Sequence, residues 1–327
     1  MIGLTYPDIN YNNIISKLIN NNNDKLVEKI IYPLIEFMKQ LEVKLIYLEK
    51  EINITRLFSY YTARKIFLDN KRVKYDDDNI LELHNIISWM VIHQSSQLMG
   101  IASDKYLVCK YAQIKLGENL CPQRIGVFDS FEEINFDKIL EKGNIMLKIS
   151  NGCYDKVAIY NNTSKEKIEE IKKKFKKSYE RDFGIKGAEF FHLYAKKRIV
   201  LEKIFLPLKD LFEFKFFILN HNIVMIFLSV QTGNKKDNYY DSDFKSLPEA
   251  PNSLDLSIFD KNLLNKLKNY AIKLSEDFPN FIRVDLYAFH NQVYLSELTF
   301  DSTNGDPYKS NFKVIQEAGK NWKRIEI

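Results

Sequence analysis

The chain has 327 residues, of which 45% are hydrophobic and 28% are charged. This composition is that of a folded globular protein, and it excludes a disordered tail, a collagen-like repeat and a disulfide-rich scaffold. The net charge of +5 arises from 48 basic and 43 acidic side chains mixed along the chain. It suits a protein that handles anionic ligands but not a dedicated nucleic-acid binder, which would carry one strongly basic face.

The cysteines and the apolar runs bear on the compartment. Three cysteines, Cys109, Cys121 and Cys153, are scattered along the chain. Their odd number argues against a disulfide framework, so we expect a reduced, cytoplasmic compartment. Residues 1–10 lack the basic and apolar regions of a signal peptide. The longest apolar run, Ile223–Val230, is far shorter than the roughly 20 residues of a membrane span.

The first hundred residues are predicted to be helical. From Asp24, apolar residues recur about every 3.6 positions, which is the period of an amphipathic helix. A second helix is expected to start at residues 76–79. Its buried face is predicted to contain Ile80, Leu83, Ile86, Ile87, Met90 and Val91. This part contains no chemical constellation, so we predict a packing role for it.

Strands and hairpins are expected after Gly100. Two short β-like runs, 145–150 and 157–160, flank the polar segment 151–156. A helix follows, predicted from the capping-box spacing of Thr163 and Glu166. Its lysines, including those at residues 172–177, are interpreted as a solvated face. The run 199–205 is predicted to be the next strand.

The last third of the chain is predicted to contain two hairpins around a helix. The first pairs residues 213–219 with 223–230 through a turn at 220–222. A polar excursion over residues 231–258 follows, and Asp260 is expected to cap a helix. The second hairpin pairs residues 282–289 with 293–300. Together these elements predict an α+β fold.

The second hairpin has the clearest chemical pattern. Because side chains alternate between the faces of a strand, Arg283 and Asp285 share one face, as do Glu297 and Thr299. A three-residue turn at 290–292 would place Asp285 opposite Glu297 and Arg283 opposite Thr299. Facing carboxylates repel each other unless a cation lies between them, and Mg²⁺ prefers such oxygen ligands. The alternative is a pair of solvent-facing acids on an edge hairpin, and a two-residue turn would shift the register.

Four further charged side chains lie in apolar, strand-like surroundings. A lone charge there is costly unless it is used. Each one alone is more readily explained as a solvent-facing residue of an amphipathic strand. Together with the facing acids, they are the cations and carboxylates of a nucleotide-phosphate site. The four are Lys148, Glu202, Lys215 and Arg283.

These residues resemble those of the ATP-grasp superfamily, and in particular its TupA-like branch, over about residues 100–320. The resemblance rests on the phrases Asp104-Lys105-Tyr106-Leu107-Val108, Glu213-Phe214-Lys215-Phe216-Phe217, Arg283-Val284-Asp285-Leu286-Tyr287 and Ser296-Glu297-Leu298-Thr299-Phe300. It implies an ATP-grasp fold, in which two α+β lobes with antiparallel sheets clasp ATP. The helical N-terminal lobe at 1–100 has no clear counterpart in the family. The resemblance implies a first lobe at 101–205 and a second lobe at 206–327.

The resemblance also implies roles for individual residues, with ATP and Mg²⁺ as cofactors. Lys105 and Lys148 would contact the ATP phosphates. Glu202 would lie at the adenine–ribose hinge, with the backbone of Lys203 and Phe205 lining the adenine slot. The segment 151–155, with one glycine, would take the place of the usual glycine-rich phosphate loop.

The remaining implied roles belong to the second lobe. Asp285 and Glu297 would hold Mg²⁺, and Thr299 stands where many ATP-grasp enzymes have a third ligand. Arg283 would hold the acyl phosphate or the γ-phosphate. Lys215 would face the phosphates or the acceptor carboxylate.

The activity implied by the resemblance is an ATP-dependent carboxylate–amine ligase that acts through an acyl phosphate. The TupA-like branch is associated with teichuronopeptide and other surface-polysaccharide biosynthesis, so a uronic acid and an amino acid are the substrates by analogy. Three alternatives stay open: a phosphotransferase with a hydroxyl acceptor, a non-catalytic nucleotide- or glycan-binding module, and an interaction protein built on the basic helix. The oligomeric state is not predicted.

Overall fold

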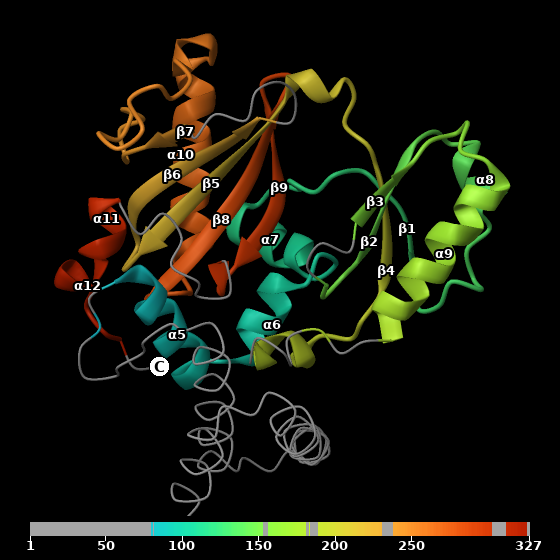
Figure 1. Cartoon of the computed structure of the whole chain (residues 1–327), viewed down its shortest axis with the longest axis horizontal. Coiled ribbons are helices and arrows are strands. Elements are labelled where there is room, and N and C mark those ends of the chain that lie inside the picture. Colours follow the sequence, from blue (N-terminus) through green and yellow to red (C-terminus); the bar gives the residue numbers. More distant parts are fainter. Residues whose placement is uncertain are drawn as a thin grey trace, which may run out of the picture.

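The computed structural model describes residues 80, 82–152, 156–180, 183, 189–230, 238–302 and 312–325. Two α+β lobes, each with its own antiparallel sheet, lie side by side (Figure 1). The predicted α+β class is therefore confirmed. The expectations for residues 1–79, including the helix from Asp24, lie outside the described residues.

The first lobe is a four-stranded sheet with two helices on one face. The strand order is β1-β4-β2-β3, with all pairs antiparallel. The elements are β1 (Arg124–Phe128), α8 (Phe136–Leu140), β2 (Ile145–Ile149), β3 (Lys156–Ile159), α9 (Lys165–Glu180) and β4 (Ile199–Lys203). The three strands predicted from apolar runs are confirmed, with ends that differ by up to two residues. Apolar side chains of α8, α9 and the sheet form one small core.

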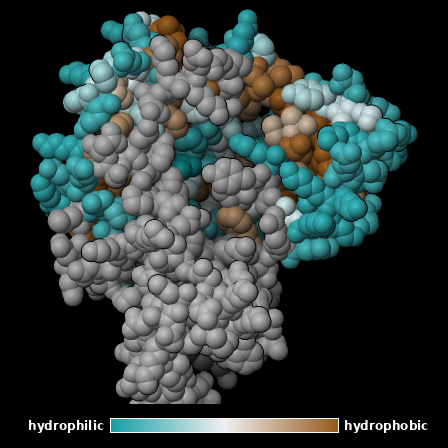
Figure 2. Space-filling view, in the orientation of Figure 1, coloured by the Kyte–Doolittle hydropathy of each residue, from teal (hydrophilic) through white to brown (hydrophobic). Residues whose placement is uncertain are grey.

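Helix α9 begins differently from the prediction. The Ser164 hydroxyl, rather than that of Thr163, accepts a hydrogen bond from the amide of Lys167 at 3.3 Å. The Thr163 hydroxyl instead accepts from the amide of Tyr160 at 2.9 Å and so belongs to the preceding turn. Hydrophilic side chains cover most of the outer surface of this lobe that Figure 2 shows, at the right. That surface agrees with the predicted solvated face.

The second lobe is a five-stranded antiparallel sheet in the order β7-β6-β5-β8-β9. Its elements are β5 (Leu211–Leu219), β6 (Asn222–Val230), β7 (Asn238–Tyr240), α10 (Lys261–Ser275), β8 (Phe281–Phe289) and β9 (Gln292–Thr299). Helix α10 packs on the apolar face of the sheet and is capped by Asp260, as predicted, through a 2.6 Å bond from the amide of Asn262. Strand β7 lies within the predicted polar excursion and pairs with β6.

Both hairpins turn through two residues instead of three. Asn220 and His221 in the first turn, and His290 and Asn291 in the second, all have positive φ. Two-residue turns with two positive φ values match the right-handed twist of paired strands, and asparagine tolerates this conformation well. The predicted three-residue turn at 220–222 is therefore wrong, and in the second hairpin the two-residue alternative is the one observed.

The remaining helices pack against the second lobe, so that residues from both ends of the described chain share the larger core. Tyr111 on α7 joins this core to α10 because its hydroxyl bonds the Leu274 carbonyl at 3.0 Å and the Asp277 carboxylate at 3.1 Å. The remaining elements are α5 (Leu83–His93), α6 (Gln97–Ser103), α7 (Val108–Leu116), α11 (Lys313–Gln316), α12 (Ala318–Asn321) and the 3₁₀ turns η2 (Phe190–Tyr194), η3 (Leu208–Asp210) and η4 (Leu256–Ile258). Helix α5 begins at Leu83, so Ile80 lies before it and is only partly buried, whereas the other five residues of the predicted apolar face are buried. The proposed boundaries at residues 100 and 205 stay a prediction.

Two further findings concern the helices and the cysteines. Within the described residues, no helix is both long and apolar enough to cross a membrane. The expectation of no disulfide is wrong, because Cys109 and Cys121 are bonded with their Cα atoms 5.7 Å apart. The fold brings α7 back beside the segment before β1, a proximity that the spacing of 12 residues did not reveal. Cys153 lies outside the described residues.

Candidate functional site

Three charged residues form a row across the second sheet. Lys215 on β5 pairs in register with Asp285 on β8, which in turn pairs with Glu297 on β9. The Lys215 ammonium lies 2.5 Å from Asp285 Oδ2, and the Asp285 side chain is fully buried. The neighbouring residues along these strands, such as Phe216 and Val284, point into the apolar core. The sheet therefore has one apolar face and one charged face.

Arg283 lies between the two facing acids. Its Nε and Nη2 donate to the two oxygens of Asp285 at 2.7 and 2.8 Å. Nη2 also donates to Glu297 Oε1 at 2.7 Å and to the Thr299 hydroxyl at 3.0 Å, and Nη1 donates to the Ser302 hydroxyl at 3.0 Å. A guanidinium and an ammonium thus balance carboxylates that would otherwise repel each other. The structure brings all five predicted second-lobe residues together.

The predicted facing of Asp285 and Glu297 is confirmed, although it arises differently from the prediction. The two-residue turn pairs Phe289 with Gln292, which alone would shift the register by one residue. A β-bulge follows, since Leu286 pairs with Leu295 while Asp285 pairs with Glu297. Ser296 is the additional residue, and it returns Glu297 to the charged face.

Sequence reasoning missed Glu213, which is a buried member of the same cluster. Its carboxylate accepts from Ser296 Oγ at 2.6 Å and lies 2.9 Å from the Lys215 ammonium. Burial raises the pKa of Glu213, but the charge of Lys215 and the bond from Ser296 outweigh it and hold this pKa below its ordinary value. The sequence feature that could have identified Glu213 is its position two residues before Lys215, on the same face of the strand.

The charge state of Glu297 follows from its neighbours. Burial raises its pKa, but Arg283 and Lys215, followed by Lys105 and Lys156, lower it to about 2. The side chain is 37% exposed, so it is the more accessible of the two facing carboxylates. Glu297 is therefore ionised at neutral pH. Lys105, in the turn between α6 and α7, and Lys156, on β3, contribute to this shift from outside the second sheet.

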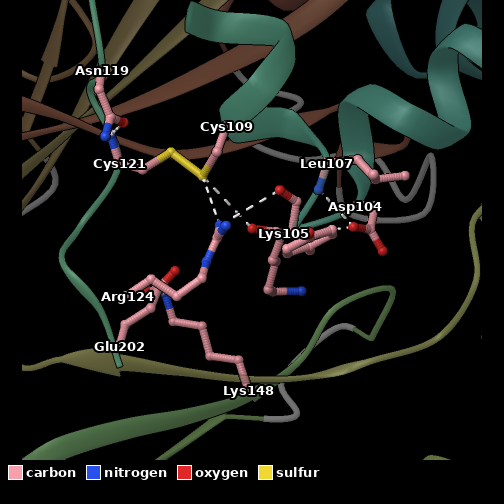
Figure 3. Close-up of a disulfide and its surroundings, with 10 residues drawn as sticks. Asp104, Lys105, Leu107, Cys109, Asn119, Cys121, Arg124, Lys148 and Glu202 are labelled. Atoms are coloured by element: carbon pink, nitrogen blue, oxygen red, sulfur yellow. Dashed lines mark hydrogen bonds and ion pairs between the residues drawn. A yellow bond between two sulfur atoms is a disulfide. The ribbon is translucent and has the colours of Figure 1, made fainter. Parts of the chain in front are cut away.

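The other half of the candidate site begins at the turn between α6 and α7. Asp104 caps this turn by accepting from the amides of Tyr106 and Leu107 at 2.9 and 2.8 Å. Lys105 is held at both ends, since its amide donates to the Ser150 carbonyl at 2.8 Å and its ammonium donates to the Gly152 carbonyl. Lys105 therefore lies against the segment that follows β2. Figure 3 shows it beside Lys148, Glu202 and Arg124.

Lys148 and Glu202, which the sequence predicts at the phosphates and at the adenine, contact each other. The Lys148 ammonium lies 2.5 Å from Glu202 Oε2, and the Glu202 side chain is only 4% exposed. Their strands, β2 and β4, are neighbours in the first sheet. The pair lies next to Arg124 (Figure 3).

The segment after β4 carries the last two predicted residues. The Lys203 amide donates to the Gln123 carbonyl at 2.8 Å. The Phe205 ring packs on three aromatic rings of the β8–β9 hairpin, with centroids 4.7 to 5.8 Å apart. Phe205 thus connects the first lobe to the second, and its backbone lies where the two lobes meet.

The oxygen ligands of the second lobe fit a divalent cation. Each carboxylate oxygen has about two lone-pair positions. Asp285 Oδ1 accepts one bond, from Arg283, and therefore keeps acceptor capacity. In the part of the chain that the structure describes, Glu297 accepts its hydrogen bonds through Oε1, which leaves Oε2 for a ligand. Two carboxylate oxygens on one sheet face are the hard ligands that Mg²⁺ prefers.

Comparison with known proteins yields one family and a set of distant structures. A search of curated proteins returns no match. D-alanine–D-alanine ligase from Bacillus anthracis is similar, with 15% identity, a TM-score of 0.38, and coverage of 66% of this chain and 59% of that one. The same enzyme from Helicobacter pylori has 15% identity, a TM-score of 0.40 and coverage of 79% and 65%.

A third similar structure is the ADP complex of N5-carboxyaminoimidazole ribonucleotide synthetase. It has 17% identity, a TM-score of 0.38, and coverage of 73% of this chain and 54% of that one. This chain therefore spans less than two thirds of the length of each of the three structures. The family model described as "TupA-like ATPgrasp" matches residues 85–323, which is most of the chain. That match covers both lobes, and the chain belongs to the TupA-like ATP-grasp family.

Proposed function

We propose that this protein is an ATP-dependent carboxylate–amine ligase that acts through an acyl phosphate. The observation that carries the proposal is the row of Lys215, Asp285 and Glu297 on one face of the second sheet, with the Arg283 guanidinium bonded to both acids. Lys105 and Lys156 add to the positive charge that lowers the pKa of Glu297. Cations opposite paired carboxylates are the side chains required by a bound nucleotide triphosphate and its metal.

In this proposal the first lobe binds ATP. Lys105 and Lys148 contact the phosphates. Glu202 is paired with Lys148, so it orients that lysine, and it faces the ribose and adenine. The backbone of Lys203 and Phe205 lines the adenine slot. The buried pair of Lys148 and Glu202 supports this assignment, because a paired lysine keeps a defined position from which to meet a phosphate oxygen.

The second lobe holds the metal and the reacting groups. Asp285 and Glu297 hold Mg²⁺, and Thr299 completes the ligand set with its hydroxyl. When bound, the metal neutralises charge on the transferring phosphoryl group. Arg283 holds the acyl phosphate or the γ-phosphate, and Lys215 stabilises the same charge from the neighbouring strand.

The chain contributes positioning and fixed charge. ATP transfers its γ-phosphoryl group to a carboxylate and leaves as ADP. An amine then attacks the acyl carbon, expels phosphate and loses a proton to form the amide. Arg283 and Lys215 are held by their carboxylate partners, so they stabilise developing negative charge without reorganisation. Holding the carboxylate and amine in contact supplies much of the remaining rate.

For the substrates, we propose an amino acid or other amine and a uronic acid of a surface polysaccharide or its precursor, in the cytoplasm. This assignment rests on the character of the TupA-like family and agrees with the mildly basic charge of the chain. A phosphotransferase would use the same nucleotide site with a hydroxyl acceptor, so product analysis distinguishes the two reactions.

The first test measures ATP binding by thermal shift, with and without Mg²⁺. Ligand at 100-fold excess over Kd stabilises the folded state by about 2.7 kcal/mol. We expect a Mg²⁺-dependent shift that Glu297→Gln and the double variant Asp285→Asn/Glu297→Gln lose. The matched control is Asp137→Asn/Glu132→Gln, which changes two exposed acids of the first lobe. Circular dichroism verifies that each variant folds.

The second test measures phosphate release with combined amines and uronic acids. A ligase releases phosphate only when both substrates are present, and hydroxylamine traps its acyl phosphate as a hydroxamate. A phosphorylated product formed without an amine would favour the phosphotransferase. Absence of a thermal shift in the folded wild type at millimolar ATP would refute the nucleotide site itself.

A further inference from the structure

The disulfide lies at the edge of the candidate nucleotide site. Cys109 is in the first turn of α7, four residues after Lys105, and Cys121 lies three residues before Arg124 at the start of β1 (Figure 3). Both cysteines are half-buried. The bond closes a loop of residues 109–121, which includes most of the segment between α7 and β1, residues 117–123.

That segment is bonded to both lobes. The Leu120 carbonyl accepts from the amide of Leu295 on β9 at 2.8 Å, next to the bulge at Ser296. The Gln123 carbonyl accepts from the amide of Lys203, at the proposed adenine slot, also at 2.8 Å. One short segment therefore connects the metal-binding hairpin to the hinge strand, and Cys121 lies between its two points of attachment.

Arg124 connects the disulfide to the charged residues. Its Nη2 lies 3.2 Å from Cys109 Sγ and 3.5 Å from the Tyr106 carbonyl. Its guanidinium also lies over the Tyr106 ring, 4.7 Å from the centroid, and its backbone pairs with that of Glu202. Within the described part of the chain, the Arg124 Nε is buried and has no acceptor.

We propose that Cys109–Cys121 is a reversible redox modification site, and that its reduction weakens ATP binding. This inference rests on the proposed nucleotide site. The intact bond holds segment 117–123 against both lobes and keeps Arg124 beside Glu202. Arg124 then serves as a positioning residue between Cys109 and Glu202.

The chemistry is thiol–disulfide exchange with an external dithiol of the thioredoxin type. A thiolate of the dithiol attacks Cys121 Sγ, the S–S bond breaks, and its electron pair leaves on Cys109 Sγ. The neighbouring Arg124 guanidinium stabilises that negative charge. The second thiol of the reductant then attacks the mixed disulfide and releases Cys121, so two electrons and two protons pass to the protein and the dithiol becomes a disulfide.

Reduction removes a covalent constraint without removing a ligand-binding side chain. Segment 117–123 then gains conformational freedom, and nucleotide binding must order it again. Coupling between two sites commonly changes affinity by 5- to 150-fold. We expect the Kd for ATP to rise about tenfold on reduction, within that range.

The experiment compares oxidised and dithiothreitol-reduced full-length protein by calorimetry with Mg²⁺ and a non-hydrolysable ATP analogue. Alkylation and peptide mapping confirm the thiol states of Cys109 and Cys121. The double variant Cys109→Ser/Cys121→Ser is expected to bind like reduced wild type and to ignore the reductant. Reoxidation of wild type is expected to restore the lower Kd.

Hydrogen exchange supplies a readout that needs no nucleotide. The Leu295 and Lys203 amides are expected to exchange faster after reduction. Equal Kd values in the two redox states, or a response of the double variant to reductant, would overturn the inference while leaving the nucleotide site intact. Absence of binding in both states would instead refute the proposed function and this inference with it. Unchanged exchange at both amides would also overturn the idea that the disulfide holds segment 117–123 against both lobes.

Discussion

Asp285 and Glu297 lie directly opposite each other on β8 and β9, with the Arg283 guanidinium bonded to both carboxylates. This contact places a cation where the charges of the two acids would otherwise repel each other. It also leaves oxygen atoms of both acids able to accept a metal. The pair is therefore at once an ion-pair network and a candidate metal site.

Ser296 is predicted to act on the site through Glu213, and the facing of Asp285 and Glu297 is expected to survive its removal. Deleting Ser296 closes the bulge, so Leu295 stays opposite Leu286 and Glu297 stays opposite Asp285 on the charged face. We expect the deletion variant to retain the Mg²⁺-dependent thermal shift with ATP. The control Ser296→Ala keeps the chain length and removes the bond to Glu213 Oε1. Loss of the shift in the deletion variant alone would contradict this account of the register.

The Lys215 ammonium is predicted to stabilise the fold through its two buried partners. In Lys215→Met, Asp285 and Glu213 lose this cation, and breaking a buried pair in this way costs about 3–5 kcal/mol. Urea denaturation measures the free energy of unfolding. Lys196→Met removes an exposed partner of Asp129 and is expected to cost at most about 1 kcal/mol. Equal losses in the free energy of unfolding would show that Lys215 stabilises the fold no more than an exposed ion pair does.

Glu297 is predicted to make stability depend on pH below its ordinary pKa of 4.5. Its pKa in the folded state is lowered to about 2, so its ionised form stabilises the fold fully above pH 4.5. That contribution is lost as the pH falls from about 4.5 to about 2. Denaturation of wild type and Glu297→Gln over this range is expected to show a stability difference that changes with pH. A stability difference that does not change with pH would indicate that the pKa of Glu297 is not lowered in the folded state.

Gly100 is predicted to be required by the close approach of α6 to η2. A Cβ at this position would lie 2.4 Å from the Phe191 carbonyl oxygen and 2.8 Å from Tyr194 Cβ. Gly100→Ala is therefore expected to lower stability by about 1–3 kcal/mol, as overpacking usually does. The exposed Gln97→Ala on the same helix is the control, with an expected change within about 0.5 kcal/mol. Thermal denaturation of both variants provides the comparison, and equal melting temperatures would refute the packing argument.

The local patterns in the sequence determined the strands, the cap of α10 and the family. Apolar runs in residues 145–150, 199–205 and 282–300 correspond to observed strands, because alternation and β-propensity act over a few neighbouring residues. The facing of Asp285 and Glu297 also followed from alternation. The family phrases placed these acids and Lys215 in one site, and the structure brings them together.

Only the tertiary structure decided how that site is assembled. The pairing of Cys109 with Cys121, the contact of Lys148 with Glu202, and the bulge at Ser296 depend on where the chain returns in space. Each joins elements that alternation describes separately, so no local pattern could predict it. The charge of Glu297 likewise depends on cations from several strands and from both halves of the site. Local sequence thus sets which face a side chain occupies, and long-range packing sets what it meets there.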